Sequence, residues 1–211
     1  MTVFRNTDGA FNRPGGSVQI DEVDLARAQE YALLANLLKR EPGDDLLNRL
    51  AALAWDGNEL GLAHAKLAQC AAQITPDAVS AEYFDLFGGL GTKGLLPYAS
   101  YYITGSLYGR PLLRLRETFQ ELGLGQVEHD GEPEDHAATF CEFMAVTAGG
   151  EMAIPFSSQR DFFREQIAPW MSRFFADLEK STDVPFYNDV GTVGRVFMEI
   201  ERKGFELAGP G

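Results

Sequence analysis

Three acidic side chains and a histidine are gathered in EPEDHAATFCEFM, the segment from Glu132 to Met144. Carboxylates beside an imidazole are typical of acid–base sites and of metal sites, so this segment is the first candidate for chemistry. The spacing supports neither kind of site. The segment has no HExxH pattern, and Cys141 would lie about 140° around a helix from His136, so the two would not face each other. We therefore expect no catalytic residue, no bound metal and no cofactor.

Helix capping accounts for the acidic residues. With Glu132 as the N-cap, Pro133 takes the first helical position, and Glu134 and Asp135 follow in the first turn. Free backbone N–H groups and the positive end of the helix dipole favour negative side chains there. Two residues, Asp135 and His136, resist this interpretation. For His136 the reason is that the dipole disfavours a protonated imidazole at that end. Two phenylalanines follow it at i+4 and i+7, which suits a half-buried polar side chain on an aromatic helix face.

The elements that must position this segment are predicted to be helices. Apolar residues recur at i, i+3 and i+4 over most of the chain, and Pro, Gly, Asn and Thr separate the periodic stretches. Strand-like alternation and hairpin signals are absent, which predicts an all-α fold. The predicted helices cover residues 23–41, 46–55, 59–74, 76–87, a stretch from 101, 111–122, a stretch from 132, 157–180 with a break at Pro169, and 189–207.

One domain is the expected organisation. Residues 1–20 lack periodicity and are predicted to be a poorly ordered leader, whereas residues 21–208 are predicted to form a single-domain multi-helix bundle. The longest irregular internal segment is GGLGTKGLLPYAS, residues 88–100, a glycine-rich loop of the kind that often carries function. Its glycines also permit exchange of elements between two copies, so a homodimer is compatible with the sequence.

Charge and composition restrict the partners. The formal net charge is -13, which opposes nucleic-acid binding and favours a basic peptide. The cysteines, Cys70 and Cys141, form no disulfide or zinc pattern, which suits the cytoplasm. No apolar stretch is long enough to cross a membrane, and the N-terminus lacks an apolar signal core, so we expect a cytoplasmic protein that does not span a membrane.

Three sequence blocks occur in a familiar order: EYFDLFGG, LPYASYY and EPEDH. Together they resemble the TorD-like family of redox-enzyme maturation chaperones, the group that includes DmsD and NarJ, over about residues 23–207. The resemblance implies an all-helical, non-enzymatic protein of the cytoplasm. It also implies a partner, the twin-arginine signal peptide or N-terminal segment of a molybdenum or tungsten oxidoreductase, whose export is delayed until its cofactor is inserted.

Eight residues match the family's peptide-binding region by motif. The resemblance implies a peptide-binding role for Tyr83, Leu86, Phe87, Pro97, Tyr98, Ser100, Asp135 and His136. The chain departs from the family in its loop, since GGLGTKGLL replaces a segment that is often rich in proline and tryptophan.

The residues themselves agree with a basic, apolar partner. Aromatic and leucine side chains near the glycine-rich loop would form an apolar groove, and the stretch from Glu117 to Gln159, which has no Lys or Arg, would supply an acidic rim. Asp135 is then expected to pair with an arginine at the rim, and His136 either to donate to the peptide backbone or to orient Asp135. Two other readings stay open: an acidic helical adaptor for another cytoplasmic protein, and an enzyme that uses Asp135 and His136, which would need a third group.

Overall fold

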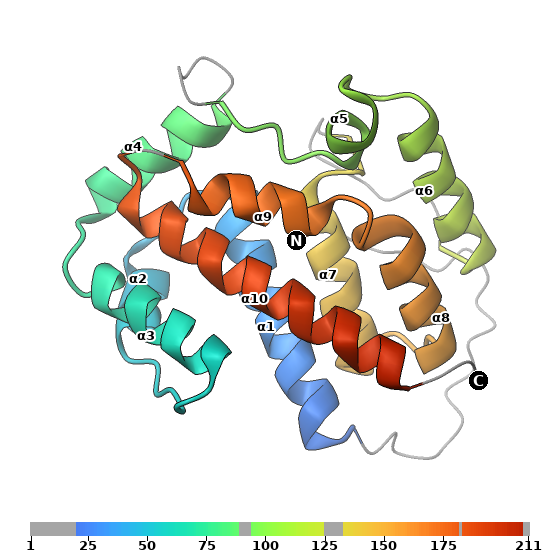
Figure 1. Cartoon of the computed structure of the whole chain (residues 1–211), viewed down its shortest axis with the longest axis horizontal. Helices are drawn as coiled ribbons and strands as arrows, with labels where there is room; N and C mark the ends of the chain where they lie inside the picture. Colours follow the sequence, from blue (N-terminus) through green and yellow to red (C-terminus); the bar gives the residue numbers. More distant parts are fainter. Residues whose placement is uncertain (1–19, 89–93, 125–132, 182, 209–211) are drawn as a thin grey trace. The chain divides into compact units, whose positions relative to one another are not determined.

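The structure is a computed structural model that describes residues 20–88, 94–124, 133–181 and 183–208 (Figure 1). Every regular element in these residues is a helix, which confirms the all-α prediction. The contacts divide the chain into two compact units, with boundaries between residues 35 and 36, 97 and 98, and 169 and 170. Residues 1–19 of the predicted leader and 89–93 of the glycine-rich loop lie outside the described residues. The single-domain assignment stays a prediction.

The first unit combines the described residues of the ranges 20–35 and 98–169. Its core lies around α7 (Ala137–Ala148), in which most side chains are buried. Four phenylalanine rings pack there with centroids 4.3 to 6.0 Å apart, two from α7 and one from each of two neighbouring helices. The clustered rings are Phe119, Phe140, Phe143 and Phe162. The elements are most of α1 (Glu22–Lys39), then α5 (Ala99–Thr104), α6 (Arg110–Glu121), α7 (Ala137–Ala148), α8 (Phe156–Phe162) and the π-helix η1 (Phe163–Ile167).

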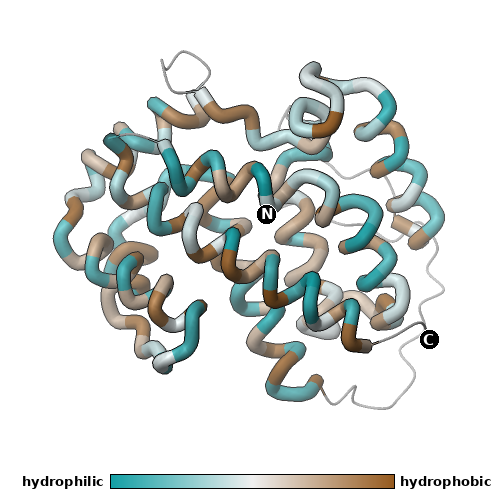
Figure 2. The backbone as a smooth tube through the Cα atoms, in the orientation of Figure 1, coloured by the Kyte–Doolittle hydropathy of each residue, from teal (hydrophilic) through white to brown (hydrophobic). Residues whose placement is uncertain are grey.

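The second unit combines the described residues of the ranges 36–97 and 170–208. Its helices are α2 (Asp44–Ala51), α3 (Glu59–Ala71), α4 (Pro76–Phe87), α9 (Met171–Glu179) and α10 (Pro185–Leu207). The predicted N-cap of α4 is confirmed, because the Thr75 side chain accepts the Ala78 N–H and Pro76 begins the helix. The long helix α10 packs against α9, α3 and α4. Figure 2 shows hydrophilic and hydrophobic residues alternating along α10, as expected for a helix with one buried face.

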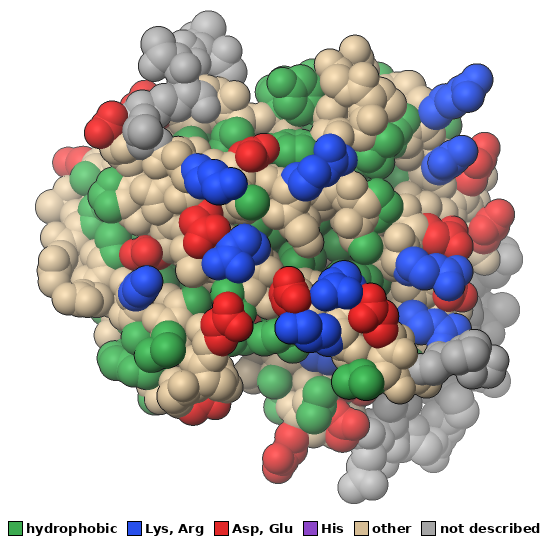
Figure 3. All heavy atoms as spheres, viewed as in Figure 1, with side chains coloured by type: hydrophobic (Ala, Val, Ile, Leu, Met, Phe, Trp, Pro, Cys, Tyr) green, Lys and Arg blue, Asp and Glu red, His purple; other side chains and the backbone are tan. Residues whose placement is uncertain are grey.

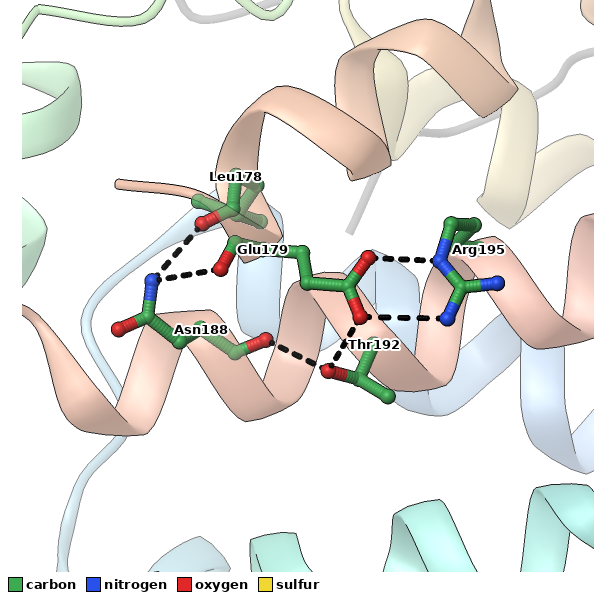
Figure 4. Close-up of polar contacts among 5 residues, drawn as sticks. All are labelled: Leu178, Glu179, Asn188, Thr192 and Arg195. Carbon is green, nitrogen blue, oxygen red and sulfur yellow. Dashed lines mark hydrogen bonds and ion pairs between the residues drawn. The ribbon is translucent and has the colours of Figure 1, made fainter. Parts of the chain in front are cut away.

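Two glycines let α9 and α10 approach closely. A Cβ atom at Gly191 would lie 2.3 Å from the Glu179 backbone nitrogen, and one at Gly194 would lie 2.2 Å from the Phe175 ring. Side chains of α10 then hold the end of α9 (Figure 4): Asn188 donates to the carbonyl oxygens of Leu178 and Glu179, and Arg195 donates to the Glu179 carboxylate. The outer face of α10 carries interspersed acidic and basic side chains, as Figure 3 shows, among them paired Arg202, Glu199 and Glu206.

The predicted start of the helix after Glu132 is wrong. Pro133, Glu134 and Asp135 are not helical, and α7 begins at Ala137 with His136 as its N-cap. The predicted break near Pro169 is confirmed, since η1 ends at Ile167 and α9 begins at Met171.

Candidate functional site

In the first unit, Asp135 caps the short helix α5 from a distant part of the chain. Its carboxylate Oδ2 accepts the Ser100 N–H at 2.8 Å, and its carbonyl oxygen accepts the Ala99 N–H at 2.9 Å. These are the first two N–H groups of α5, which a helix leaves without internal partners. The acid therefore does what the capping interpretation expected, but for a helix 35 residues earlier in the chain.

Asp135 is fully buried, with 0% of its surface exposed. The prediction that this carboxylate lies on an open rim and pairs there with an arginine is therefore wrong for this structure. Its second oxygen, Oδ1, is buried and has no hydrogen-bond partner among the described residues. Because the Asp135 carboxylate has no exposed surface and accepts, from the part of the chain that the structure describes, only the Ser100 N–H, it can influence a ligand only by fixing the position of the α5 backbone.

Ser100, whose backbone Asp135 holds, in turn fixes the backbone of the turn after α5. Its side chain is fully buried, and its Oγ accepts the Tyr108 N–H at 3.0 Å. Tyr108 has a φ of 68°, in the left-handed region that costs a residue with a Cβ atom about 1–2 kcal/mol. The buried hydroxyl helps to offset that strain. The result is a fixed turn that presents the ring of Tyr108, which is 59% exposed.

His136 caps α7 and contacts Tyr98. Its Nδ1 accepts the Ala138 N–H at 3.1 Å, so in this arrangement the ring hydrogen is carried by Nε2. The rings of His136 and Tyr98 meet edge to face, with centroids 5.1 Å apart, and the two backbones form an isolated bridge. Because Tyr98 is the N-cap of α5, this contact ties the starts of two helices together.

Glu134 holds a third helix. Its carboxylate accepts two hydrogen bonds from Arg116 of α6, at 2.9 and 2.7 Å. These bonds raise the pKa of the Arg116 guanidinium. Three consecutive side chains, Glu134, Asp135 and His136, therefore fix α6, α5 and α7 in turn. Sequence reasoning missed Arg116, which stands next to the buried Leu115 and carries no motif of its own.

In the second unit, the predicted residues lie on or just after α4. The rings of Tyr83 and Phe87 are half-buried and pack against each other and against Tyr187 of α10, with centroids 5.2 to 6.1 Å apart. Leu86 is fully buried, and Pro97 is buried as well. Phe84, which sequence reasoning did not select, is 58% exposed beside Tyr83. The α4 aromatic face, defined as Tyr83, Phe84 and Phe87, is thus partly open.

A second buried acid of the motif blocks also caps a remote helix. Both oxygens of Glu82 accept backbone N–H groups at the start of α10, from Phe186 at 3.4 Å and from Tyr187 at 3.1 Å. The Tyr187 hydroxyl, whose pKa is raised by burial, donates to the Leu37 carbonyl oxygen. Sequence reasoning missed Glu82, although a signal was present: with Val79 and Leu86 it occupies the buried face of α4.

The thiols show no sign of catalytic activation. Burial, with the negative charges of Asp189 and Glu82, raises the pKa of Cys70 to about 11, and burial raises the pKa of Cys141 as well. Both are therefore almost entirely protonated near neutral pH. Among the described residues, no cluster of three or more His, Cys, Asp or Glu side chains is arranged to hold a metal ion.

The eight predicted residues fall into two groups. Tyr98, Ser100, Asp135 and His136 are brought together in the first unit, and Tyr83, Leu86, Phe87 and Pro97 lie in the second. Their peptide-binding role stays a prediction. None of the helices in the described residues has the length and apolarity needed to cross a membrane.

Comparisons with a family model and with curated proteins place the chain in the same family. Residues 55–176 match the model of the family described as nitrate reductase delta subunit. Chaperone protein TorD of Vibrio cholerae is 30% identical over 133 residues, which cover 59% of this chain and 60% of that protein. Chaperone protein TorD of Vibrio vulnificus is 24% identical over 81% of this chain and 90% of its own length.

A solved structure agrees with this result. The crystal structure of a putative redox enzyme maturation protein from Archaeoglobus fulgidus superposes with a TM-score of 0.53 at 25% identity, covering 82% of this chain and 92% of that one. The matched curated relatives are named chaperones, which agrees with the prediction of a non-enzymatic protein. The family match covers more than half of the 211 residues. The chain therefore belongs to the nitrate reductase delta subunit family, the TorD-like proteins.

Proposed function

We propose that this chain is a cytoplasmic maturation chaperone for a molybdenum or tungsten oxidoreductase. It binds the twin-arginine leader or the equivalent N-terminal segment of that enzyme and delays export until the cofactor is inserted. The names of the matched relatives, TorD chaperones and a putative redox enzyme maturation protein, support the class of function. The chemistry of the α4 surface supports the choice of ligand.

The observation that carries the proposal is the α4 aromatic face beside exposed carboxylates. Asp77, Phe84 and Asp85 share the exposed face of α4, at i, i+7 and i+8. The chain has no Lys or Arg between residues 67 and 92, so no nearby cation in sequence offsets these acids. A twin-arginine leader joins a basic segment to an apolar one. Partly open aromatic rings next to carboxylates match both parts.

The eight residues then have two kinds of role. In the second unit, Tyr83 and Phe87 are only half-buried and offer ring surface to the leader; Tyr98, in the first unit, is half-buried as well. The buried members, Leu86, Pro97, Ser100, Asp135 and His136, hold the elements that carry these rings. Apolar contact dominates the affinity, because burying a Leu- or Phe-sized side chain contributes about 1.5–3 kcal/mol, whereas an exposed ion pair contributes about 0–1 kcal/mol.

The test is a titration of the full chain with a synthetic leader peptide that has two consecutive arginines followed by an apolar segment. Fluorescence anisotropy gives Kd for this peptide, for a version with both arginines changed to glutamate, and for a version with serines in the apolar segment. We expect both altered peptides to bind at least about tenfold more weakly. The Phe84→Ala and Phe87→Ala variants should each weaken binding of the unaltered peptide by about tenfold.

Leu207→Ala is the matched control, since Leu207 is 88% exposed on α10 and its removal should leave Kd unchanged. Equal affinity for all three peptides, or a loss of affinity in the control as large as in the α4 variants, would contradict the proposal. Co-purification of an oxidoreductase subunit, abolished by deleting its leader, tests the same function in cells.

A further inference from the structure

A second apolar surface lies in the first unit and includes none of the eight residues assigned to the leader. All residues from 103 to 110 are exposed, from the end of α5 through the connecting turn to the first residue of α6. Figure 3 shows hydrophobic side chains gathered over α5 and basic ones projecting over α6. The exposed apolar residues, which we name the α5–α6 surface, are Tyr101, Ile103, Leu107, Tyr108 and Leu113.

This surface is held in one shape by buried groups. Asp135 fixes the start of α5, and Ser100 holds the backbone of Tyr108 in its left-handed conformation. Thr104 donates to the Ser100 carbonyl oxygen at 2.8 Å, which secures the end of the same helix. Tyr108 has a strained backbone and is 59% exposed, so more than half of its surface is left open to solvent in this chain. Its fixed presentation suits contact with another molecule.

Basic side chains flank the surface. Arg110, Leu113 and Arg114 lie on one exposed face of α6, with a leucine between the two arginines. Neither guanidinium forms an ion pair or hydrogen bond with another residue that the structure describes. Arg110 and Arg114 are therefore cations without an ion-pair partner among the described residues, beside an apolar surface, in a chain with a formal net charge of -13.

We propose that the α5–α6 surface binds a segment of a partner protein in which apolar side chains alternate with Asp and Glu. The charge complementarity with Arg110 and Arg114 selects an acidic segment, so the occupant differs from a cationic leader. A short segment covers only this surface, whereas an anionic membrane would also face the surrounding acidic side chains of the chain. A second copy placed symmetrically on the surface would bring like arginines together.

A random 16-residue display library, selected against the purified full chain, tests the proposal without a known partner. We expect the enriched peptides to combine Leu, Ile or Phe with Asp and Glu. Their Kd values should rise at least about tenfold for Tyr108→Ser with Leu113→Ser, and as much for Arg110→Glu with Arg114→Glu. All four residues are exposed, so the variants should keep the thermal unfolding midpoint of the native chain.

The charge-reversed variant gives a second readout, because it should prefer peptides in which Lys replaces Asp and Glu. Arg164→Glu with Leu207→Ser is the control, since both residues are exposed elsewhere in the chain, and it should not change Kd. Failure to enrich peptides, enrichment of basic ones, or insensitivity to the four substitutions would overturn the proposal. So would binding to phosphatidylglycerol vesicles, or self-association, that the same substitutions abolish in place of peptide binding.

The result is separable from the leader-binding function. The Arg110→Glu with Arg114→Glu variant should bind the twin-arginine peptide with the Kd of the native chain. Loss of leader binding in the Phe84→Ala variant should leave the acidic peptides bound. If both ligands depend on the same residues, the α5–α6 surface is not a separate site and the inference fails, whatever the outcome for the leader.

Discussion

Asp135 accepts the backbone N–H of Ser100 at 2.8 Å across 35 residues of sequence. Glu82 makes the corresponding contact in the second unit, where its carboxylate accepts the N–H groups of Phe186 and Tyr187 more than 100 residues away. Each of these motif acids is buried and sits at the start of a helix that is remote in sequence. The acids that mark the family pattern are therefore tertiary helix caps, and their removal should change stability before it changes recognition.

Replacing Asp135 by alanine should lower the free energy of unfolding by about 1–3 kcal/mol, because the buried Ser100 N–H is left without an acceptor. Asp135→Asn should recover part of the loss, since its amide oxygen can still accept. Urea denaturation of both variants gives the comparison, with Asp161→Ala as the control because Asp161 is 49% exposed. An alanine variant as stable as the native chain would show that this cap contributes nothing.

The same variant also tests how Asp135 influences the leader. A buried carboxylate acts by positioning, so the affinity lost in Asp135→Ala should be equal at low and at high salt. A direct, exposed ion pair would be screened and would lose more affinity at low salt. Anisotropy titrations at about 0.05 and 0.5 M NaCl separate the two, with Debye lengths that differ about threefold. A salt-dependent loss would restore the rim role that the structure opposes.

Glu82 should contribute as much to the stability of the second unit as Asp135 does to that of the first. Glu82→Ala leaves two N–H groups at the start of α10 without acceptors, and we expect a loss of about 2–4 kcal/mol, whereas Glu82→Gln should lose less. Asp85→Ala on the exposed face of the same helix is the matched control and should change stability by less than about 0.5 kcal/mol. Equal effects of Glu82→Ala and Asp85→Ala would refute the capping role.

Much of this architecture could be predicted from the sequence, because the helices depend on local signals. Apolar periodicity and the Thr75-Pro76 cap placed α4 correctly, and Pro169 indicated the break before α9. The role of Asp135 could not be predicted, because nothing local distinguishes an acid that caps its own helix from one that caps a helix 35 residues away. His136 was misjudged for a related reason: a neutral imidazole can accept a backbone N–H, whereas the prediction considered its charged form.

The close contact of α9 and α10 gives a steric test. Gly194→Ala places a Cβ atom on the Phe175 ring, and Gly191→Ala places one against the Glu179 backbone, which cannot move away without shifting α9. Each should lose about 1–3 kcal/mol of stability through overpacking. Gly204→Ala in the same helix is the control, because nothing lies within 4 Å of its Cβ position. That variant should gain up to about 1 kcal/mol from helix propensity.

Thermal or urea unfolding distinguishes these outcomes by the sign of the change in the free energy of unfolding. Stabilisation by all three alanines would mean that helix propensity alone governs α10 and that the close approach is unimportant. Destabilisation by Gly191→Ala and Gly194→Ala, with stabilisation by Gly204→Ala, is the pattern that the contact requires.

The ion pair between Arg195 and Glu179 should make part of the stability depend on pH. Its hydrogen bonds, at 2.6 and 3.2 Å, lower the pKa of the Glu179 carboxyl below its ordinary value. The folded chain then binds fewer protons at this site than the unfolded chain, so the stabilisation is present above about pH 4.3, the unfolded value, and is lost as the pH falls through the folded pKa. Arg195→Met should remove this pH-dependent stabilisation, and since the pair is partly exposed its contribution should not exceed about 1 kcal/mol.

A double-mutant cycle with Glu179→Gln, measured by urea denaturation at pH 7 and again near pH 3, should show a coupling energy between Arg195 and Glu179 that is positive at the higher pH and smaller at the lower. A coupling energy that is the same at both values would mean that the two side chains do not interact through the charge of the carboxylate.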